Sequence, residues 1–349
     1  MAHDSPAATG DLATAPVSAE LAAAARNAVT ICLAATPADR AVVVYDASAR
    51  SIAAALCRAF DAIGAPCAAC DIDAFGGRPL TVLPGAVAKT LGAATVSALA
   101  MTPMPGEIAL RKAVLDIVIE RGLRHAHMPS VTEPVFLDGL SMDYRQVARF
   151  IGRLVATLES AREIRMTSPA GTDLVCRCAV PPRIERLDGM IAPGSWQNLP
   201  SGQIVIQPAG AEGVFVADRN LGDWFEHTYR VSDYPVRFEF EECQVREIHC
   251  DNRKLERDLR LFLRSSANSG RISEVVIGAN LGLTQGHRSA LFEGYRPGAS
   301  ITIGAFPSPA KGWTSATSVP VFGARKSLFV GARRIMTDDV FCDELLREP

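Results

Sequence analysis

The 349-residue sequence lacks an excess of charge of either sign. Lys and Arg total 36 and Asp and Glu total 38, so the formal net charge is −2. Nucleic acids and anionic membrane surfaces are bound by clustered cations, so we expect neither as a partner. No apolar run approaches the roughly 18 residues that a membrane-spanning helix needs. A soluble protein of about two domains is expected.

The first 18 residues lack the basic segment and the apolar segment of a secretory signal. We interpret residues 1–18 as a flexible leader. The nine cysteines are odd in number and scattered along the chain. This usage favours reduced thiols and a cytoplasmic location over a disulfide framework.

Several catalytic motifs are also missing. No G-x-G-x-x-G follows the apolar run that ends at Tyr45, and the chain has no G-x-x-x-x-G-K-[ST] loop. Neither a G-x-S-x-G elbow nor an H-E-x-x-H helix occurs. These absences weaken nucleotide binding, serine hydrolysis and zincin-type proteolysis as functions.

The first half of the chain alternates β-rich runs with helical periodicity. Repeated β-then-α units predict a parallel sheet with helices on its faces. The fold class is therefore α/β for an N-terminal domain at residues 19–163. The predicted strands are 41–45, 67–72, 94–101 and 123–128, and the predicted helices are 51–63, 107–121 and 144–163.

After residue 163 the helical periodicity fades, and glycine, proline and short alternating runs replace it. This pattern predicts a β-rich α+β domain at residues 164–349. The predicted strands are 204–207, 213–217, 236–241 and 300–304, with one helix at 253–265.

Three short pairs could suggest metal ligands: Cys67 with Cys70, Cys176 with Cys178, and His125 with His127. Residues three apart on a strand point to opposite faces, so Cys67 and Cys70 should diverge. We interpret the cysteines as small buried side chains. The two histidines are interpreted as a polar pair at the end of a strand.

An ordered series of motifs carries a family resemblance. The series comprises Ser168–Leu174 (SPAGTDL), Asn198–Ile204 (NLPSGQI), Gly213–Asp218 (GVFVAD), Glu274–Asn280 (EVVIGAN) and Val319–Phe322 (VPVF). In order and spacing it resembles the aminopeptidase T family of metallopeptidases and the related iron-dependent 2,5-dihydroxypyridine dioxygenases. The resemblance covers the second domain, and the α/β first domain fits it.

The resemblance implies a two-metal site with five ligand positions. In this sequence they fall on Gln203, Glu274, Ser300 (or Ala299, one residue earlier), Ala316 and Ser318. Only Glu274 keeps a side chain that binds divalent ions well, and one carboxylate does not hold such an ion tightly against water. We therefore expect no metal and no cofactor.

A cleft that has lost its ions would be neutral and rich in hydrogen-bonding groups, which suits a peptide backbone. The predicted peptide-binding residues are Trp196, Gln203, Glu274, His287, Arg288, Ser300, Thr302, Trp313, Ser315, Thr317 and Ser318. Further aromatic anchors could come from Trp224, Tyr229 and Phe306.

Two functional hypotheses follow. In the first, the chain resembles metal-lacking peptide-binding proteins of crocagin-type ribosomal peptide pathways, which present a precursor peptide to modifying enzymes. In the second, it is an enzyme. A remodelled metal site would use Glu274 and His287 with Asp218 or Glu293, whereas a metal-free catalyst would exchange protons through Glu274 and His287 alone. The relatives assemble as dimers or rings, so a homo-oligomer is expected.

Overall fold

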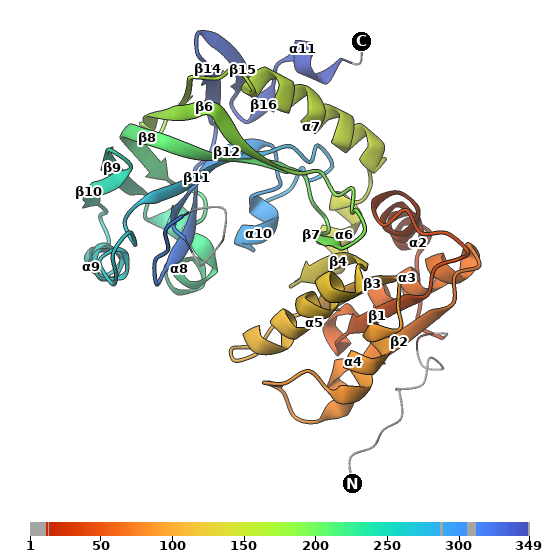
Figure 1. Cartoon of the computed structure of the whole chain (residues 1–349). Helices are drawn as coiled ribbons and strands as arrows, with labels where there is room; N and C mark the ends of the chain where they lie inside the picture. The colour runs from red at the N-terminus through yellow and green to blue at the C-terminus, as the bar shows by residue number, and fades with distance from the viewer. Residues whose placement is uncertain (1–11, 13, 287–288, 306–311, 348–349) are drawn as a thin grey trace. The chain divides into compact units, whose positions relative to one another are not determined.

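The computed structural model describes residues 12, 14–286, 289–305 and 312–347, and it divides into two units (Figure 1). The first unit contains residues 1–148 and 188–201. The second contains residues 149–187 and 202–349. In the described part of the chain, no helix has both the length and the apolar character needed to span a bilayer.

The first unit is built on a five-stranded parallel sheet, as the repeated β-then-α pattern predicts. The strand order is β2-β1-β3-β4-β7. Every residue of β1 and β3 is buried, which explains why β1 is a continuous apolar run and β3 is apolar except for Ser97. The strands are β1 (Ala41–Tyr45), β2 (Cys67–Asp71), β3 (Val96–Met101), β4 (Arg124–Pro129) and β7 (Ser195–Asn198).

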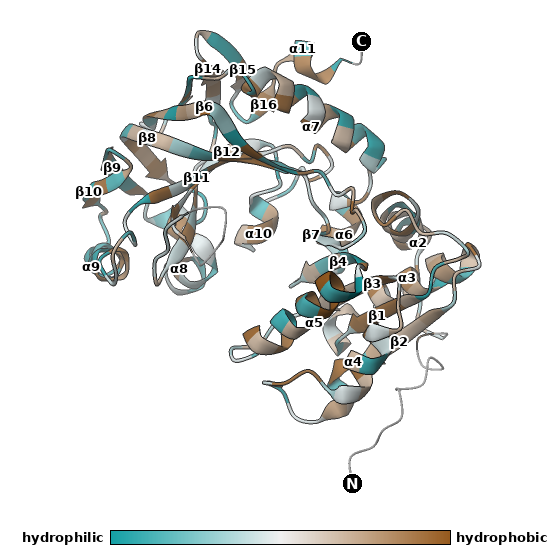
Figure 2. Ribbon diagram, viewed as in Figure 1, coloured by the Kyte–Doolittle hydropathy of each residue, from teal (hydrophilic) through white to brown (hydrophobic). Residues whose placement is uncertain are grey.

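Helices follow the strands of this sheet. Apolar side chains of α4 and α5 pack with β1, β2 and β3 in one core cluster, while α2 and α3 pack against each other and α3 contacts β1 and β2. The helices are α2 (Ala19–Asn27), α3 (Arg50–Ala62), α4 (Gly85–Gly92), α5 (Ile108–Arg121), α6 (Glu133–Gly139) and α7 (Tyr144–Leu158). Figure 2 shows the amphipathic pattern on α7, whose ribbon changes between teal and brown along its length.

The second unit contains an antiparallel sheet with the order β13-β12-β11-β8-β6-β5-β14-β15-β16, and β9 joins β8 and β10. The predicted strands at 204–207 and 213–217 are parts of one long strand, β8. The strands are β5 (Glu163–Thr167), β6 (Asp173–Leu187), β8 (Gln203–Ala217), β9 (Val236–Glu241), β10 (Gln244–His249), β11 (Ile272–Gly278), β12 (Gly298–Gly304), β13 (Ser318–Phe322), β14 (Ser327–Val330), β15 (Arg333–Thr337) and β16 (Val340–Phe341).

After β8, the described part of this unit contains the α-helices α8 (Gly222–Tyr229), α9 (Arg253–Leu263), α10 (Ala290–Glu293) and α11 (Asp343–Leu346). The predicted helix at 253–265 corresponds to α9. Asn252 caps it by accepting hydrogen bonds from the backbone N–H groups of Lys254 and Leu255, each at 3.1 Å. The mixed α/β class with one parallel and one antiparallel sheet confirms the predicted fold.

The structure corrects the domain boundary expected at residue 163. The first unit ends within α7, and residues 188–201 return to it because β7 pairs with β4 and extends the parallel sheet. Four-residue β7 carries no apolar run, so its place in the sheet was not visible in the sequence.

The flexible leader predicted at residues 1–18 is only partly described, because residues 1–11 and 13 lie outside the described part. The remaining leader residues pack on the first unit. Leu12 is buried, and the Arg58 guanidinium donates to the carbonyl of Ala15 at 2.6 Å. Ser18 accepts a hydrogen bond from Leu21 N–H and caps α2. These contacts connect the described leader residues to the first unit.

Candidate functional site

One face of the antiparallel sheet brings several predicted residues together. Glu274 on β11 lies directly opposite Thr302 on β12, and Ser300 lies between Val276 and Phe322. Directly opposite residues and residues two apart share a face. Motifs nearly 100 residues apart in the chain therefore become neighbours on this face.

A cavity of about 390 Å³ opens on this face, within the second unit. We call it the first cavity. Its polar lining consists of Gln203, Asp223, Glu274, Ser300, Thr302 and Ser318. The apolar wall includes Leu221, Trp224, Phe225, Phe262, Val276, Leu291, Val319, Pro320 and Phe322.

Helix α8 supplies much of the apolar wall. It begins at Gly222, whose φ of +66° is in the left-handed region, and a Cβ there would lie 3.0 Å from Val319 Cγ2. Glycine thus allows α8 to approach β13 closely. Asp223 Oδ1 accepts a hydrogen bond from Ala290 N–H at 2.7 Å, which joins α8 to α10. The Phe225 ring then packs edge-on against Phe262 of α9, with centroids 5.3 Å apart.

The polar lining has unused hydrogen-bonding capacity. Within the described residues, the side chains of Gln203, Ser300, Thr302 and Ser318 form no hydrogen bond. An amide and three hydroxyls can each donate and accept. Asp223 and Glu274 are the charged side chains of the described lining, which includes no Lys, Arg or His. The described lining of the first cavity thus carries two carboxylates, with spare donors and acceptors beside an aromatic wall.

The other predicted cleft residues lie elsewhere. Ser315 and Thr317 are buried in the segment before β13, where Ser315 Oγ accepts from Ala305 N–H at 2.9 Å and donates to the Thr317 carbonyl. They stabilise this segment and do not line the first cavity. Trp313 lines a different cavity of the second unit, and Trp196 lies on β7 of the first unit. His287, Arg288 and Phe306 lie outside the described residues.

Among the further aromatic residues, Trp224 lines the first cavity, whereas the Tyr229 hydroxyl binds Asp258 instead. The analysis of the sequence missed Asp223, Phe225 and Phe262. In the sequence, only the short D-W-F run at 223–225 marked this region. The contact between α8 and α9 is tertiary, so no local pattern could predict it.

The donor set at the implied ligand positions does not fit a two-metal centre. It consists of the Glu274 carboxylate, an amide, hydroxyls and an alanine, and amides and hydroxyls are weak ligands for transition ions. Among the described residues, no group of three or more His, Cys, Asp or Glu side chains could share an ion.

The two substitute ligands of the remodelled-site hypothesis are committed to other contacts. Asp218 Oδ1 accepts from Ala324 N–H at 2.6 Å. Buried Glu293 accepts from Arg219 Nη1 and Arg296 Nη1, each at 3.1 Å. A carboxylate held by two guanidinium groups is poorly available to a cation.

The predicted histidine pair is also placed differently. His125 and His127 lie inside β4 and are buried, so the strand-end interpretation is wrong. His125 Nδ1 lies 2.8 Å from Ser97 Oγ. Burial lowers the pKa of His125 to about 3, and that of His127 well below its usual value, because charging an imidazole away from water is unfavourable.

Three of the four cysteines in the predicted pairs are buried, as interpreted, whereas Cys67 is half-buried. Cys67 and Cys70 diverge as predicted: the Cys67 thiol contacts Cys57 Sγ at 3.4 Å, whereas Cys70 packs in the apolar core beside α4 and α5. Cys176 and Cys178 are buried on β6, and burial raises the pKa of both thiols. Thiols of raised pKa are poor metal ligands at neutral pH.

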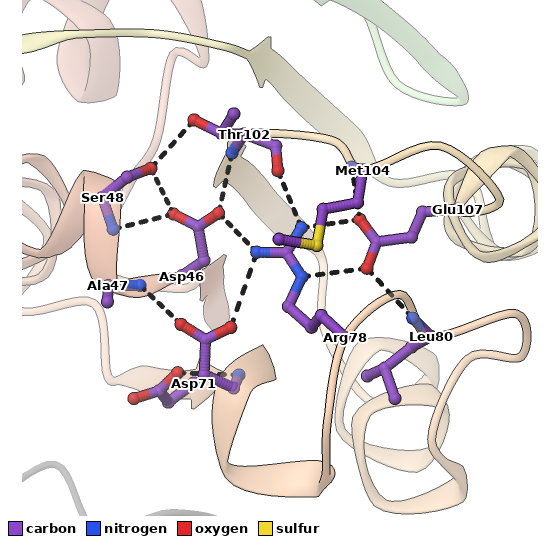
Figure 3. A network of polar contacts seen from close by, with 10 residues as sticks. Asp46, Ala47, Ser48, Asp71, Arg78, Leu80, Thr102, Met104 and Glu107 are labelled. Carbon is purple, nitrogen blue, oxygen red and sulfur yellow. Dashed lines mark hydrogen bonds and ion pairs between the residues drawn. The ribbon is translucent and has the colours of Figure 1, made fainter.

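A second polar cluster lies beyond the carboxyl ends of β1 and β3 in the first unit (Figure 3). Arg78 donates from Nε and Nη2 to the Glu107 carboxylate at 2.9 and 2.6 Å, and from Nη1 to Asp46 at 2.7 Å. Its Nη2 also donates to the carbonyl of Thr102 at 2.7 Å. The hydrogen bond from Arg78 lowers the pKa of Glu107 to about 2. Because the guanidinium is already committed to these acceptors, the cluster holds loops together and has little left to offer a ligand.

Comparisons with known proteins agree with this architecture. A family model described as 2,5-dihydroxypyridine 5,6-dioxygenase matches residues 131–265. No curated protein sequence matches the chain. The structure of 2,5-dihydroxypyridine dioxygenase from Pseudomonas putida superposes with a TM-score of 0.66 at 18% identity, covering 95% of this chain and all of that one.

Wild-type AmpT from Thermus thermophilus superposes with a TM-score of 0.65 at 14% identity, covering 92% of this chain and 98% of that one. At these identities the likeness shows the fold. The chain is thus built on the scaffold that these two proteins share.

Proposed function

We propose that the first cavity binds a peptide without a metal ion, and that the protein presents this peptide to a modifying enzyme. The observation that supports it best is the set of uncommitted side chains, Gln203, Ser300, Thr302 and Ser318, which lie beside two carboxylates and an aromatic wall. A volume of about 390 Å³ is within the usual range for ligand pockets.

Peptide chemistry matches this lining. Each peptide unit offers one donor and one acceptor, which the amide and hydroxyl groups can pair with. A side chain next to these units would bury apolar surface against Trp224 and Phe262. The Glu274 and Asp223 carboxylates favour an ammonium group over an anion. A peptide amino terminus therefore suits the cavity better than an acidic segment.

The presenting role rests on the changed ligand positions. The scaffold is similar to that of a protein titled AmpT and to that of a ring-cleaving dioxygenase. At the positions where the resemblance implies metal ligands, this chain carries Gln203, Ser300, Ala316 and Ser318 instead. The cavity keeps a polar and aromatic lining but lacks the implied metal ligands, which supports peptide binding rather than catalysis. In this proposal the ligand is a ribosomally made precursor peptide, and the protein works as a homo-oligomer.

The first test fills the cavity. Ser300→Leu places about three extra carbon atoms in the lining, and we expect it to abolish binding of the tetrapeptide Leu-Gly-Gly-Phe in isothermal titration calorimetry. Ser300→Ala is the matched control, because it removes one hydroxyl and should weaken binding only about fivefold. Equal affinity of wild type and Ser300→Leu would reject the first cavity as the peptide site.

The second test addresses the enzyme alternative. The protein is soaked with Zn²⁺ or Fe²⁺, desalted and analysed for bound metal, and we expect a substoichiometric amount. Stoichiometric metal that disappears in Glu274→Gln, together with peptide hydrolysis or ring cleavage, would favour the remodelled metalloenzyme. Metal-independent turnover that is lost in His287→Ala would favour the acid–base catalyst.

A further inference from the structure

The second unit contains another cavity, of about 290 Å³, which we call the second cavity. Strands β6, β8 and β11 and the segment before β13 contribute to it. Its lining consists of Ala179, Arg183, Gln207, Pro208, Ala209, Arg271, Ile272, Ser273 and Trp313. The sequence analysis assigned Trp313 to the same cleft as Glu274, but the structure separates them.

The charge of the second cavity is opposite to that of the first. Arg183 and Arg271 both line it, and the described lining includes no Asp or Glu. Neither guanidinium forms a hydrogen bond or ion pair with the described part of the chain. In contrast, Arg78 contacts three carboxylates and Arg177 contacts two. Two unpaired like charges facing one cavity repel each other, and a bound anion would offset this repulsion.

The fold places both arginines at this cavity and restrains the guanidinium of Arg271. Arg183 lies directly opposite Gln207 in the β6–β8 pairing, so their side chains share a face. The Arg271 backbone donates to Asn268 O at 3.0 Å and accepts from Gly304 N–H at 2.7 Å. Its guanidinium lies over the Trp313 ring, 5.0 Å from the centroid. A stacked guanidinium loses little further freedom when it binds an anion.

We infer that the second cavity binds the carboxylate of an organic ligand. The planar forks of Arg183 and Arg271 match the two oxygens of a carboxylate, and the Gln207 amide adds a donor. Pro208 and the Trp313 ring add a smaller apolar part to this mostly polar lining, and the carbon body of an organic carboxylate would pack against them, which an inorganic oxyanion cannot do.

The two cavities lie along the same strands. Gln203 lines the first and Gln207 the second, four residues further along the same face of β8. Four residues of strand span about 13 Å, which is about the length of four residues of extended peptide. A short peptide could thus place its ammonium group near Glu274 and its carboxylate near Arg183 and Arg271. This assignment of both ends rests on the proposed function, whereas carboxylate binding in the second cavity does not.

The decisive experiment uses N-benzoylglycine, a carboxylate with a planar body, in calorimetry with the full chain. We expect saturable binding that weakens at least tenfold in Arg271→Gln and in Arg183→Gln. Arg165→Gln is the matched control, since Arg165 is an exposed arginine paired with Asp173, and it should bind as wild type does. Inorganic phosphate should compete weakly. Absence of binding, wild-type affinity in both variants, or phosphate binding as tight as N-benzoylglycine binding would each overturn the inference.

Experiments with a peptide ligand distinguish this inference from the proposed function. The C-terminal amide of Leu-Gly-Gly-Phe should bind the wild-type protein about tenfold more weakly than the free acid does. The variant Ser300→Leu should bind N-benzoylglycine as tightly as the wild type. If N-benzoylglycine binds but no peptide does, the second cavity stands and the proposed function fails. If the peptide and its amide bind equally in wild type and Arg271→Gln, the second cavity is not used and the peptide site remains the first cavity alone.

Discussion

At the scale of single residues, Lys326 places an ammonium group where water does not reach it. Its side chain is 0% exposed, donates to Thr172 Oγ1 at 3.1 Å and to Val216 O at 3.3 Å, and lies 4.6 Å from the Phe215 ring centroid. Burial lowers the pKa of Lys326 to about 8, although the charges of Asp218 and Asp339 partly oppose this effect. The ammonium group therefore costs stability at neutral pH that it would not cost as a neutral amine.

This cost predicts a pH-dependent stability difference. Between about pH 8 and 10.5 the unfolded chain binds the Lys326 proton and the folded chain does not, so this residue makes the free energy of unfolding rise with pH. In Lys326→Met the free energy of unfolding should lack this increase with pH, which is on the order of 3 kcal/mol between about pH 8 and 10.5. Urea unfolding of wild type and variant at pH 7, 8, 9 and 10 measures it, and parallel pH profiles would contradict the pKa of Lys326.

Sequence analysis reached some of the site residues and missed others for a physical reason. Gln203, Glu274 and Ser300 each lie in or near a motif of the resemblance, so their strand positions could be predicted. Arg183 and Arg271 lie in no motif and are 88 residues apart. Only the order of β6, β8 and β11 in the sheet brings them to one cavity.

At the scale of elements, β8 depends on one backbone conformation. Gly213 has a φ of +115°, and a Cβ there would lie 2.2 Å from the carbonyl oxygen of Asp173 on β6. The conformation and the close approach both exclude a side chain. The single glycine thus lets 15-residue β8 pair with β6 on both sides of this point.

Gly213→Ala should therefore lower the free energy of unfolding by about 3 kcal/mol, because both strain and a clash contribute. Gly331→Ala is the control: its φ is +56°, but nothing lies within 4 Å of an added Cβ, so only the conformational cost of about 1 kcal/mol applies. Chemical denaturation of the two variants gives both values. Equal losses would show that the contact with Asp173 adjusts without cost.

Elements with a clear apolar pattern were predictable, and elements without one were not. The buried run of β1 and the amphipathic α9 were found within two residues of their observed ends. Strand β7 has four residues and no apolar alternation, and α8 has eight residues without a side-chain cap at its start. Neighbouring chain segments stabilise both, and a local pattern does not contain that information.

At the scale of the whole molecule, the chain crosses between the two units three times, after residues 148, 187 and 201. Residues 188–201 complete the first unit. The Tyr144 hydroxyl accepts from Ser201 N–H at 2.8 Å and donates to Ser201 O at 3.1 Å, and Gly189 leaves no room for a Cβ beside the Tyr144 ring. A boundary at residue 163 would separate Tyr144 from these partners and would leave β4 without β7.

Two fragments test this division. Residues 1–148 joined to 188–201 by a Gly/Ser linker should unfold cooperatively in urea. Residues 1–163 should unfold at a clearly lower urea concentration, because the buried Tyr144 ring loses its cover and its backbone partners, a loss of about 3 kcal/mol or more. Near-ultraviolet circular dichroism reports the packing of Tyr45 and Tyr144 in both fragments, and a Trp196→Phe version of the joined fragment removes the tryptophan signal that residues 1–163 lack. If residues 1–163 are at least as stable as the joined fragment, residues 188–201 belong energetically to the second unit, and the contiguous boundary is the better description.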